Sequence, residues 1–216
     1  MARRQMKSAH VATVRNRAPP SGRRERKKAQ LRERIVQTAI EMFRERGYEK
    51  TRIDDINESL DISRTTFFRY FPSKDMLLRE FVAVLRMNVL KSTLASDAPV
   101  TERLRNFYVT LAETWQADLP VARAMIMAGT NTLVRSPGYR ERYIEQFGPL
   151  QELLAEGQRR GEVTRDLSVR QLTIFIESLT YSVLAIWAAG FIAPAELVKE
   201  TIAAVDFFLR HAQPSN

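Results

Sequence analysis

Hydrophobic residues along this chain recur every three or four positions, which is the period of an α-helix. The first stripe consists of Leu31, Ile35, Ala39 and Phe43. It stops before Gly47, so the pattern predicts a helix over about residues 24–46. Two short helices are predicted within residues 51–71, and Ser73 is placed to cap a longer helix that ends near residue 93.

The second half of the chain is also divided into helices. Proline and glycine breaks separate predicted helices at about residues 101–118, 121–135 and 139–160. Ser168 and Gln171 form a capping box, so another helix begins there. Pro194 suits the first position of the last helix. The sequence therefore predicts an all-α protein of about nine helices without a convincing strand.

The two short helices have faces of different character. We expect Thr51 to cap the first helix, Asp61 to lie at the turn and Ser63 to cap the second. The packing face of the second helix carries Phe67, Tyr70 and Phe71. Its opposite face carries Arg64, Thr65, Phe68 and Arg69. A short helix that is held by one face and offers arginines, a hydroxyl and an aromatic ring fits a recognition helix for the DNA major groove.

This segment resembles the DNA-binding domain of TetR-family transcriptional regulators, and the similarity runs over about residues 28–81. The matching residues are Arg46-Gly47-Tyr48, Thr51, Asp55-Ile56, Ile62-Ser63, Thr66-Phe67 and Tyr70-Phe71-Pro72-Ser73-Lys74. The resemblance implies a three-helix, helix-turn-helix domain at the N-terminus, followed by a larger helical domain. Together with the open face of the second short helix, it predicts DNA contacts by Thr51, Arg52, Ser63, Arg64, Thr65, Thr66, Phe68, Arg69, Tyr70 and Lys74.

The chain departs from the family's usual pattern at four positions. The family usually has Ala in place of Asn57, Gly in place of Asp61 and Thr65, and Tyr in place of Phe68. Aspartate tolerates the left-handed backbone that a turn can need, so Asp61 is a mild change. Phe68 matters more, because the family's tyrosine resembles a phosphate-contacting residue and its hydroxyl is missing here.

Positive charge is concentrated at the N-terminus. The chain has a formal net charge of +9, and residues 1–28 hold ten Lys or Arg against Glu25 alone, so the rest is formally neutral. We expect this arm to lie along DNA phosphates or in the minor groove, with a solvated tail as the alternative. The predicted division is a basic arm (1–23), a DNA-binding domain (24–72) and a helical effector-binding and dimerisation domain (73–216).

The helix that follows Ser168 is apolar nearly all round. One domain core covers only one side of a helix, so the other side needs a partner. With the last helix it would form a four-helix bundle across a twofold axis, as the family resemblance also implies. The predicted dimer interface comprises Phe175, Leu179, Val183, Ile186, Trp187, Ile202, Val205 and Leu209. A helix buried inside a monomer is the alternative.

The resemblance further implies a small-molecule pocket in the larger domain. Its candidate lining residues are Met87, Phe107, Leu111, Trp115, Met125, Met127 and Glu177. Aromatic residues and methionines at helical spacing also occur in plain cores. Glu177 is the one carboxylate in the most apolar helix, so it is a candidate to bind a cationic or hydroxylated group, with a salt bridge or an exposed helix edge as the alternatives.

Other function classes have less support. The chain has no Cys, and its two histidines, His10 and His211, are not placed for catalysis. Phosphate-binding glycine loops and metal-ligand spacings are also missing, so we expect no enzyme activity, no metal and no cofactor. Residues 172–192 are the longest apolar run, but their polar residues favour a buried helix over a membrane span. The N-terminus lacks the apolar core of a signal peptide, so we expect a cytoplasmic protein.

The sequence thus predicts a homodimeric, TetR-like transcriptional regulator. We expect a repressor that binds a palindromic operator in double-stranded DNA and is released by a small, largely apolar effector. An architectural DNA-binding protein without an effector is the alternative, and an enzyme is the least supported reading. The first two differ in whether the larger domain contains an open cavity.

Overall fold

The computed structural model describes residues 22–94, 96–135 and 147–214. Its elements are α2 (Arg23–Arg46), α3 (Ile53–Leu60), α4 (Arg64–Tyr70), α5 (Lys74–Leu94), α6 (Val100–Ala117), α7 (Leu119–Arg135), α9 (Gly148–Arg160), α10 (Val169–Ala188), the 3-10 helix η1 (Pro194–Glu196) and α11 (Leu197–His211). The described residues thus form nine α-helices and no strand, which confirms the all-α prediction. The first part of the helix predicted at 139–160 lies outside the described residues.

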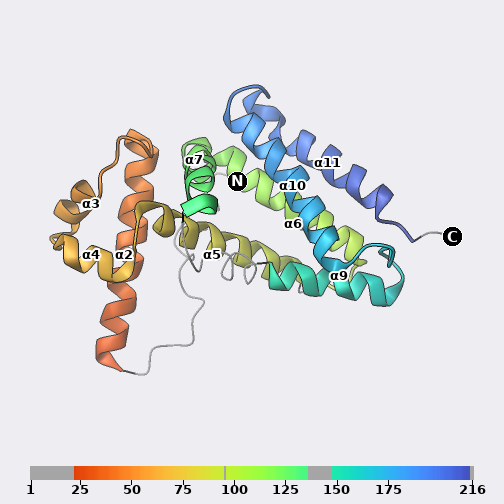
Figure 1. Ribbon diagram of the computed structural model, residues 1–216, viewed down its shortest axis with the longest axis horizontal. Helices are drawn as coiled ribbons and strands as arrows, with labels where there is room; N and C mark the ends of the chain where they lie inside the picture. Colours follow the sequence, from red (N-terminus) through yellow and green to blue (C-terminus); the bar gives the residue numbers. More distant parts are fainter. Residues whose placement is uncertain (1–21, 95, 136–146, 215–216) are drawn as a thin grey trace, which may run out of the picture.

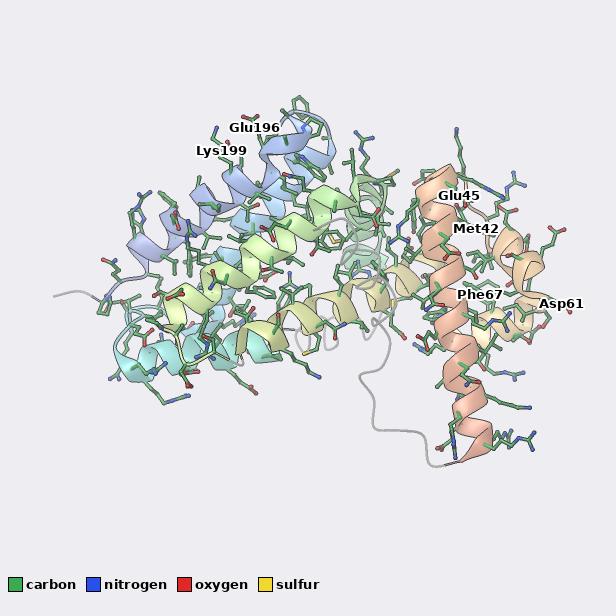
Figure 2. All side chains as sticks on the ribbon, turned by 180° about the vertical axis from the view of Figure 1, so that it is seen from behind. Met42, Glu45, Asp61, Phe67, Glu196 and Lys199 are labelled. Atoms are coloured by element: carbon green, nitrogen blue, oxygen red, sulfur yellow. The ribbon has the colours of Figure 1, made fainter. Side chains whose placement is uncertain are left out.

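Helices α2, α3 and α4 form a small unit at one end of the molecule, with α3 and α4 on the side of α2 that faces away from the other helices (Figure 1). Its interior is filled by fully buried side chains, namely Ile35, Phe43, Ile56, Phe67 and Phe71. Figure 2 shows Phe67 beside α2, whereas Asp61 lies at the outer edge of the unit. Burying each of these side chains stabilises the unit by about 1.5–3 kcal/mol relative to exposure.

The turn between α3 and α4 agrees with the sequence prediction. Asp61 has a left-handed backbone with φ 52°, and its N–H donates to the carbonyl of Glu58 at 3.2 Å. The hydroxyl of Ser63 accepts the N–H of Thr66 at 3.1 Å, which satisfies a donor in the first turn of α4. Both predictions are confirmed, and the turn fixes the angle between α3 and α4.

The predicted cap at Thr51 is wrong. Helix α3 begins at Ile53, and the carboxylate of Asp55 accepts the N–H of Arg52 at 3.0 Å. Thr51 is only 1% exposed, and its hydroxyl donates to the carbonyl of Gly47 at 2.9 Å. The threonine therefore closes the loop after α2 and has no part in starting α3.

The remaining helices form a larger bundle. Helix α11 packs against α6 and α10, and α5 packs against α6 and α7 and leads from the small unit into the bundle (Figure 1). The hydroxyl of Ser168 accepts the N–H of Gln171 at 3.3 Å, and the Gln171 side chain accepts the N–H of Ser168 at 2.9 Å. This pair confirms the predicted capping box. Pro194 opens a short 3-10 turn, so the α-helical part of the last helix begins three residues later, at Leu197.

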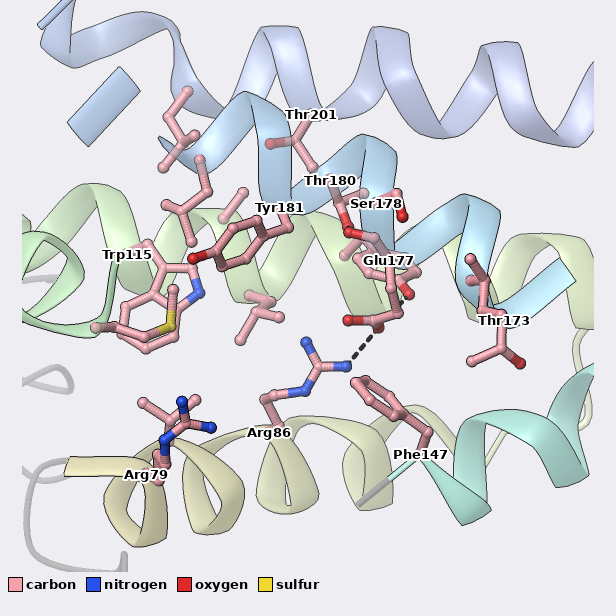
Figure 3. Close-up of a pocket in the computed structure, with 18 of the residues that line it drawn as sticks. Arg79, Arg86, Trp115, Phe147, Thr173, Glu177, Ser178, Thr180, Tyr181 and Thr201 are labelled. Carbon is pink, nitrogen blue, oxygen red and sulfur yellow. Dashed lines mark hydrogen bonds and ion pairs between the residues drawn. The ribbon is translucent and has the colours of Figure 1, made fainter. Parts of the chain in front are cut away.

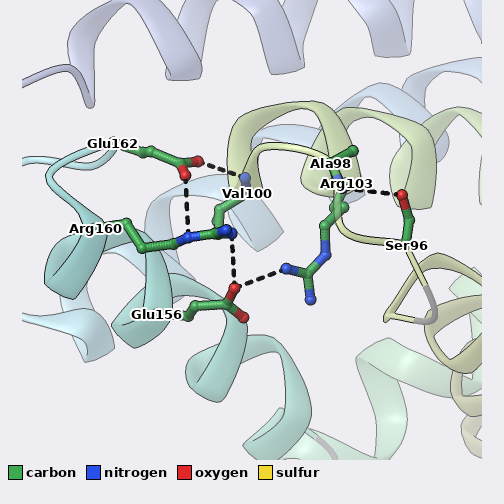
Figure 4. A network of polar contacts seen from close by, with 7 residues as sticks. All are labelled: Ser96, Ala98, Val100, Arg103, Glu156, Arg160 and Glu162. Carbon is green, nitrogen blue, oxygen red and sulfur yellow. Dashed lines mark hydrogen bonds and ion pairs between the residues drawn. The ribbon is translucent and has the colours of Figure 1, made fainter.

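Charged side chains fasten the start of α6 to the end of α9 (Figure 4). Buried Arg103 donates to Glu156 at 2.9 Å, and Arg160 donates to the same carboxylate oxygen at 2.9 Å. The carboxylate of Glu162 accepts the N–H of Val100, the first residue of α6. A negative charge at this position is favourable because the helix dipole is positive there. The network fixes the end of the bundle that lies farthest from α2–α4 (Figure 1).

Two ion pairs join the small unit to the bundle. Arg32 of α2 pairs with Glu80 of α5. Arg44 of α2 pairs with Asp118, the residue that follows α6, at an N–O distance of 2.8 Å. The small unit is therefore held both by α5 and by the corner between α6 and α7.

Helix α10 is long and apolar enough to cross a membrane on length and composition alone. In the structure it packs against α7, α9 and α11 instead. Only 33% of its apolar window is buried within the chain, so the bundle covers one part of α10 and leaves another part exposed.

Candidate DNA-binding surface and internal cavity

The outer face of α4 is an exposed surface on a firmly held helix. Arg64, Thr65, Phe68 and Arg69 are all exposed. Phe68 has 44% of its surface exposed, whereas its neighbour Phe67 has none. Because Phe67 anchors the helix in the core, α4 presents its outer side chains in a fixed orientation. This arrangement suits insertion into a major groove, where side chains must meet base edges in register.

Arg64 already has an ionic partner within the chain. Its Nε lies 3.2 Å from the carboxylate of Asp54, and both side chains are largely exposed. Exposed pairs of this kind contribute about 0–1 kcal/mol, so the guanidinium can exchange Asp54 for a base or a phosphate at little cost.

The other predicted DNA contacts differ in how accessible they are. Arg52 and Ser63 are exposed, and Thr66 and Tyr70 are half-buried. The hydroxyl of Thr66 lies 2.9 Å from that of Ser63. Thr51 is buried, so its side chain does not reach the surface of α4. The structure thus brings most of the predicted set to one surface, and DNA contact by that surface stays a prediction.

Lys74 has a structural role that sequence reasoning missed. Its ammonium donates to the carbonyl of Tyr48 at 2.6 Å and to that of Thr51 at 2.9 Å. It also lies 4.1 Å from the centre of the Tyr48 ring, and burial lowers the pKa of Lys74. The Tyr48 hydroxyl donates to Asp75, and burial with this hydrogen bond raises the pKa of Tyr48. Lys74 therefore clamps the loop before α3 onto the start of α5.

The larger bundle contains a cavity of about 860 Å³ that is partly open to solvent. Residues of α5, α6, α7, α9, α10 and α11 contribute to its wall. Apolar lining residues include Val82, Leu111, Trp115, Met125, Phe147 and Leu184. A volume of this size fits the usual range for small-molecule sites. Four of the seven predicted pocket residues line the cavity, namely Leu111, Trp115, Met125 and Glu177, whereas Met87, Phe107 and Met127 are not part of its wall.

An ion pair crosses the middle of the cavity between α5 and α10 (Figure 3). The guanidinium of Arg86 lies 2.5 Å from the carboxylate of Glu177, and the side chains are only 18% and 15% exposed. The hydroxyl of Tyr108 donates to the same carboxylate oxygen at 2.7 Å. Burial, together with the negative charge of Glu177, raises the pKa of Tyr108, so the phenol stays protonated and remains a donor. Of the alternatives for Glu177, the structure shows the salt bridge.

Two further arginines line the cavity, and the sequence analysis singled out neither. Arg79 lies on α5, seven residues before Arg86, and Arg170 lies in the first turn of α10, seven residues before Glu177. Seven residues make two helical turns, so each pair shares a face. This spacing could have identified Arg79 and Arg170 as cavity-lining residues if α5 and α10 had been expected to face each other.

The predicted dimer residues separate into two groups. Phe175 and Ile186 are exposed, and Leu179, Val183, Ile202 and Leu209 are half-buried. Trp187 and Val205 are 2% and 0% exposed, so the monomer core already holds them, and the Trp187 ring nitrogen donates to the carbonyl of Pro194 at 3.1 Å. Phe207, which the prediction omitted, is half exposed. Six of the eight predicted dimer residues therefore remain at the surface of α10 and α11, namely Phe175, Leu179, Val183, Ile186, Ile202 and Leu209.

Comparisons with known proteins agree on one kind of molecule. Residues 35–81 match the model of the tetR family of bacterial regulatory proteins. The chain is 26% identical over 154 residues to the HTH-type transcriptional repressor DhaR of Mycobacterium sp. strain GP1, over 68% of this chain and 76% of that one. It is 28% identical over 156 residues to the HTH-type transcriptional regulator TcmR of Streptomyces glaucescens, over 69% of each.

Solved structures share the fold over most of this chain. Thermus thermophilus FadR, a TetR-family transcriptional repressor in complex with lauroyl-CoA, matches with a TM-score of 0.70 and 25% identity, over 82% of this chain and 93% of that one. Bacillus subtilis FadR in complex with stearoyl-CoA matches with a TM-score of 0.64 over 82% of this chain and 97% of that one. At 18% identity, the second match shows the fold alone.

Proposed function

This chain belongs to the TetR family of bacterial regulatory proteins, and we propose that it is a repressor that binds a palindromic operator as a homodimer and is released by a small molecule. It is a DNA-binding transcriptional regulator and not an enzyme. Such a protein acts in the cytoplasm, where it reaches the chromosome. The observation that carries the proposal is the exposed face of α4, held in place by a fully buried aromatic core.

Two copies of α4 are needed to read a palindrome, and the apolar surface on α10 and α11 supports a second copy. Phe175, Leu179 and Ile186 lie on a different side of α10 from Glu177 and Tyr181, because an offset of two residues turns a helix by about 200°. One side of α10 therefore faces the cavity while another remains available to a partner. In the proposed dimer, the two recognition helices would lie about 34–36 Å apart, one turn of DNA.

The cavity supports a regulator over an architectural DNA-binding protein. A chain that only shapes DNA gains nothing from an unfilled interior, because voids forfeit packing energy. Helix α5 contributes Arg79, Val82 and Arg86 to the cavity wall, and its first residue, Lys74, clamps the loop before α3. A ligand that changes the tilt of α5 would therefore change the spacing of the recognition helices. Thermus FadR, which binds lauroyl-CoA, gives a related precedent for a small-molecule effector.

Selection from random DNA tests the proposal and identifies the operator in the same experiment. The full chain should enrich an inverted repeat whose half-sites are one helical turn apart. The double variant Arg64→Ala, Arg69→Ala should lose about 1–3 kcal/mol of discrimination for each base pair that an arginine reads. Arg159→Ala, Arg210→Ala is the matched control, because these arginines are exposed on α9 and α11. Enrichment of the same repeat, with equal affinity, by the α4 double variant would refute the assignment.

A further inference from the structure

We propose that the effector is an uncharged, largely apolar molecule with a hydroxyl group, and that this hydroxyl donates a hydrogen bond to Glu177 inside the cavity. The inference rests on the proposed function, because it takes the cavity as the effector site. In this arrangement Glu177 keeps its salt bridge with Arg86 and binds the ligand through its other carboxylate oxygen.

Only one carboxylate oxygen of Glu177 is used within the described part of the chain. Oε1 accepts the guanidinium of Arg86 at 2.5 Å and the hydroxyl of Tyr108 at 2.7 Å. None of the described residues donates a hydrogen bond to Oε2. Figure 3 shows that this second oxygen points toward the side of the cavity that holds Tyr181 and Trp115. Because the Glu177 side chain is only 15% exposed, a ligand donor would replace water at Oε2 in a strong, charge-assisted hydrogen bond.

The salt bridge selects against charged groups at this oxygen. A cation bound to Oε2 would bring a second positive charge next to Arg86, with one carboxylate between them. The site would then hold an uncompensated charge at low exposure, which is costly. A carboxylate ligand has no proton to donate and would be repelled by Glu177. A neutral hydroxyl avoids both penalties.

Neighbouring hydroxyls on α10 are also acceptors. Thr173 and Thr180 lie one turn before and one turn after Glu177, and both line the cavity. The hydroxyl of Thr173 donates to the carbonyl of Val169 at 2.8 Å, and that of Thr180 donates to the carbonyl of Ile176 at 2.8 Å. A hydroxyl has one hydrogen, so each of these oxygens can only accept from a ligand. This part of the wall therefore suits a molecule that donates hydrogen bonds.

Aromatic rings lie on both sides of the ion pair. Figure 3 shows Phe147 on one side of Arg86 and Glu177, and Tyr181 and Trp115 on the other. Phe147 and Trp115 are buried, and the centre of the Phe147 ring lies 5.5 Å from the guanidinium carbon of Arg86. Such rings pack well against a flat apolar body in stacked or edge-to-face contacts. Fused aromatic rings that carry one hydroxyl are therefore suitable probes.

A substituent series on pyrene tests the inference by fluorescence titration of the full chain at pH 7. 1-Hydroxypyrene donates a hydrogen bond, 1-methoxypyrene only accepts, and pyrene does neither. 1-Hydroxypyrene should bind about tenfold more tightly than either, which corresponds to about 1.4 kcal/mol. It should also bind more tightly than the cation 1-pyrenemethylammonium. 1-Pyrenecarboxylate tests the alternative that an acid binds to Arg79 or Arg170 in the cavity wall.

Glu177→Gln separates the hydroxyl contact from the rest of the cavity. Its amide has one accepting oxygen, which Arg86 and Tyr108 would occupy, so a donating NH2 group takes the place of Oε2. The preference for 1-hydroxypyrene over 1-methoxypyrene should fall to about twofold or less, because the acceptor has become a donor. Pyrene should bind as before, which shows that the cavity is intact. Glu113→Gln is the matched control, since Glu113 is exposed on α6 and does not line the cavity, and it should keep the full preference.

Four results would overturn the inference. They are equal binding of 1-hydroxypyrene and 1-methoxypyrene, tighter binding of either charged probe, a hydroxyl preference that survives in Glu177→Gln, and failure of every probe to bind.

Operator binding, measured separately, distinguishes this inference from the proposed function. If 1-hydroxypyrene binds through Glu177 but the affinity for the selected operator does not change, the ligand class stands and the release mechanism fails. If all uncharged probes bind equally well and release the operator, release stands and the hydroxyl inference fails.

Discussion

The DNA-binding end and the effector end of this molecule differ in where they place their polar residues. Helices α2–α4 close their interior with Phe43, Phe67 and Phe71 and carry the candidate DNA contacts outside. The larger bundle keeps a cavity of about 860 Å³ and holds an ion pair inside it. Stability and function should therefore separate cleanly at the DNA end, whereas they should be coupled at the effector end.

The clearest separation of stability from DNA binding is expected for two adjacent aromatic residues of α4. Phe67→Ala removes a fully buried ring and should lower the free energy of unfolding by about 3–5 kcal/mol, because it leaves a cavity in a small core. Phe68→Ala should change stability by less than about 0.5 kcal/mol but alter operator preference, because its ring is 44% exposed on the outer face. Urea unfolding and operator titration measure the two effects. Similar losses of stability in both variants would contradict the separation.

At the effector end, the comparison rests on the pair of Arg86 and Glu177. Glu177→Leu should cost about 3 kcal/mol, because it removes the carboxylate that Arg86 and the Tyr108 hydroxyl both bind in a largely buried site. The double variant Arg86→Met, Glu177→Leu should recover most of that loss, since it removes both charges together. Urea unfolding of Glu177→Leu, of Arg86→Met and of the double variant measures the coupling energy between the two side chains. Additive losses would show that the pair contributes nothing as a unit.

Local signals explain which features the sequence could predict. The caps at Ser63 and Ser168 and the left-handed turn at Asp61 depend on residues within a few positions of one another, and all three were found. The packing face of α4 was found for the same reason, since Phe67 and Phe71 are one turn apart.

Long-range contacts explain most of the misses. The structural role of Lys74 was not foreseen, because nothing in its local sequence shows that the carbonyls of Tyr48 and Thr51 lie beside its ammonium. Trp187 looked available to a dimer because helical periodicity does not tell a face buried within the chain from one buried between chains. Arg86 and Glu177 are 91 residues apart, so their pairing appears only after α5 and α10 are brought together.

One buried side chain at the DNA end is polar and contrasts with the aromatic residues around it. Asn57 of α3 is only 5% exposed, and neither its amide nitrogen nor its amide oxygen has a hydrogen-bond partner among the described residues. Asn57→Ala should therefore raise the free energy of unfolding by about 1–2 kcal/mol, from removal of an unsatisfied amide and from better helix propensity. Thermal unfolding measures the gain.

Ser59→Ala serves as the control for helix propensity, because Ser59 is exposed on the same helix. Its gain should stay within about 0.5 kcal/mol. An Asn57→Ala variant that is no more stable than this control would indicate that the amide is satisfied in solution, for instance by water.

The smallest expected effect comes from an ion pair on the outside of the bundle, which contrasts with the pair inside the cavity. Arg105 of α6 donates to Asp206 of α11 at 2.8 Å, and both side chains are more than a third exposed. The hydrogen bond from Arg105 lowers the pKa of Asp206. A depressed carboxyl pKa stabilises the fold above the unfolded pKa of about 3.9 and loses that contribution as pH falls through the folded value. Solvent screening limits the contribution to about 0.2–1 kcal/mol.

Asp206→Asn should therefore be slightly less stable than the parent chain at pH 7, and the two should converge as pH falls below about 4. Added salt should shrink the difference at pH 7, because both charges are exposed to solvent. The same salt should affect the Arg86 and Glu177 coupling energy less, since burial shields that pair from counterions. Equal salt sensitivity of the two pairs would mean that water fills the cavity freely, and the contrast between a closed DNA end and a charged, protected effector site would no longer hold.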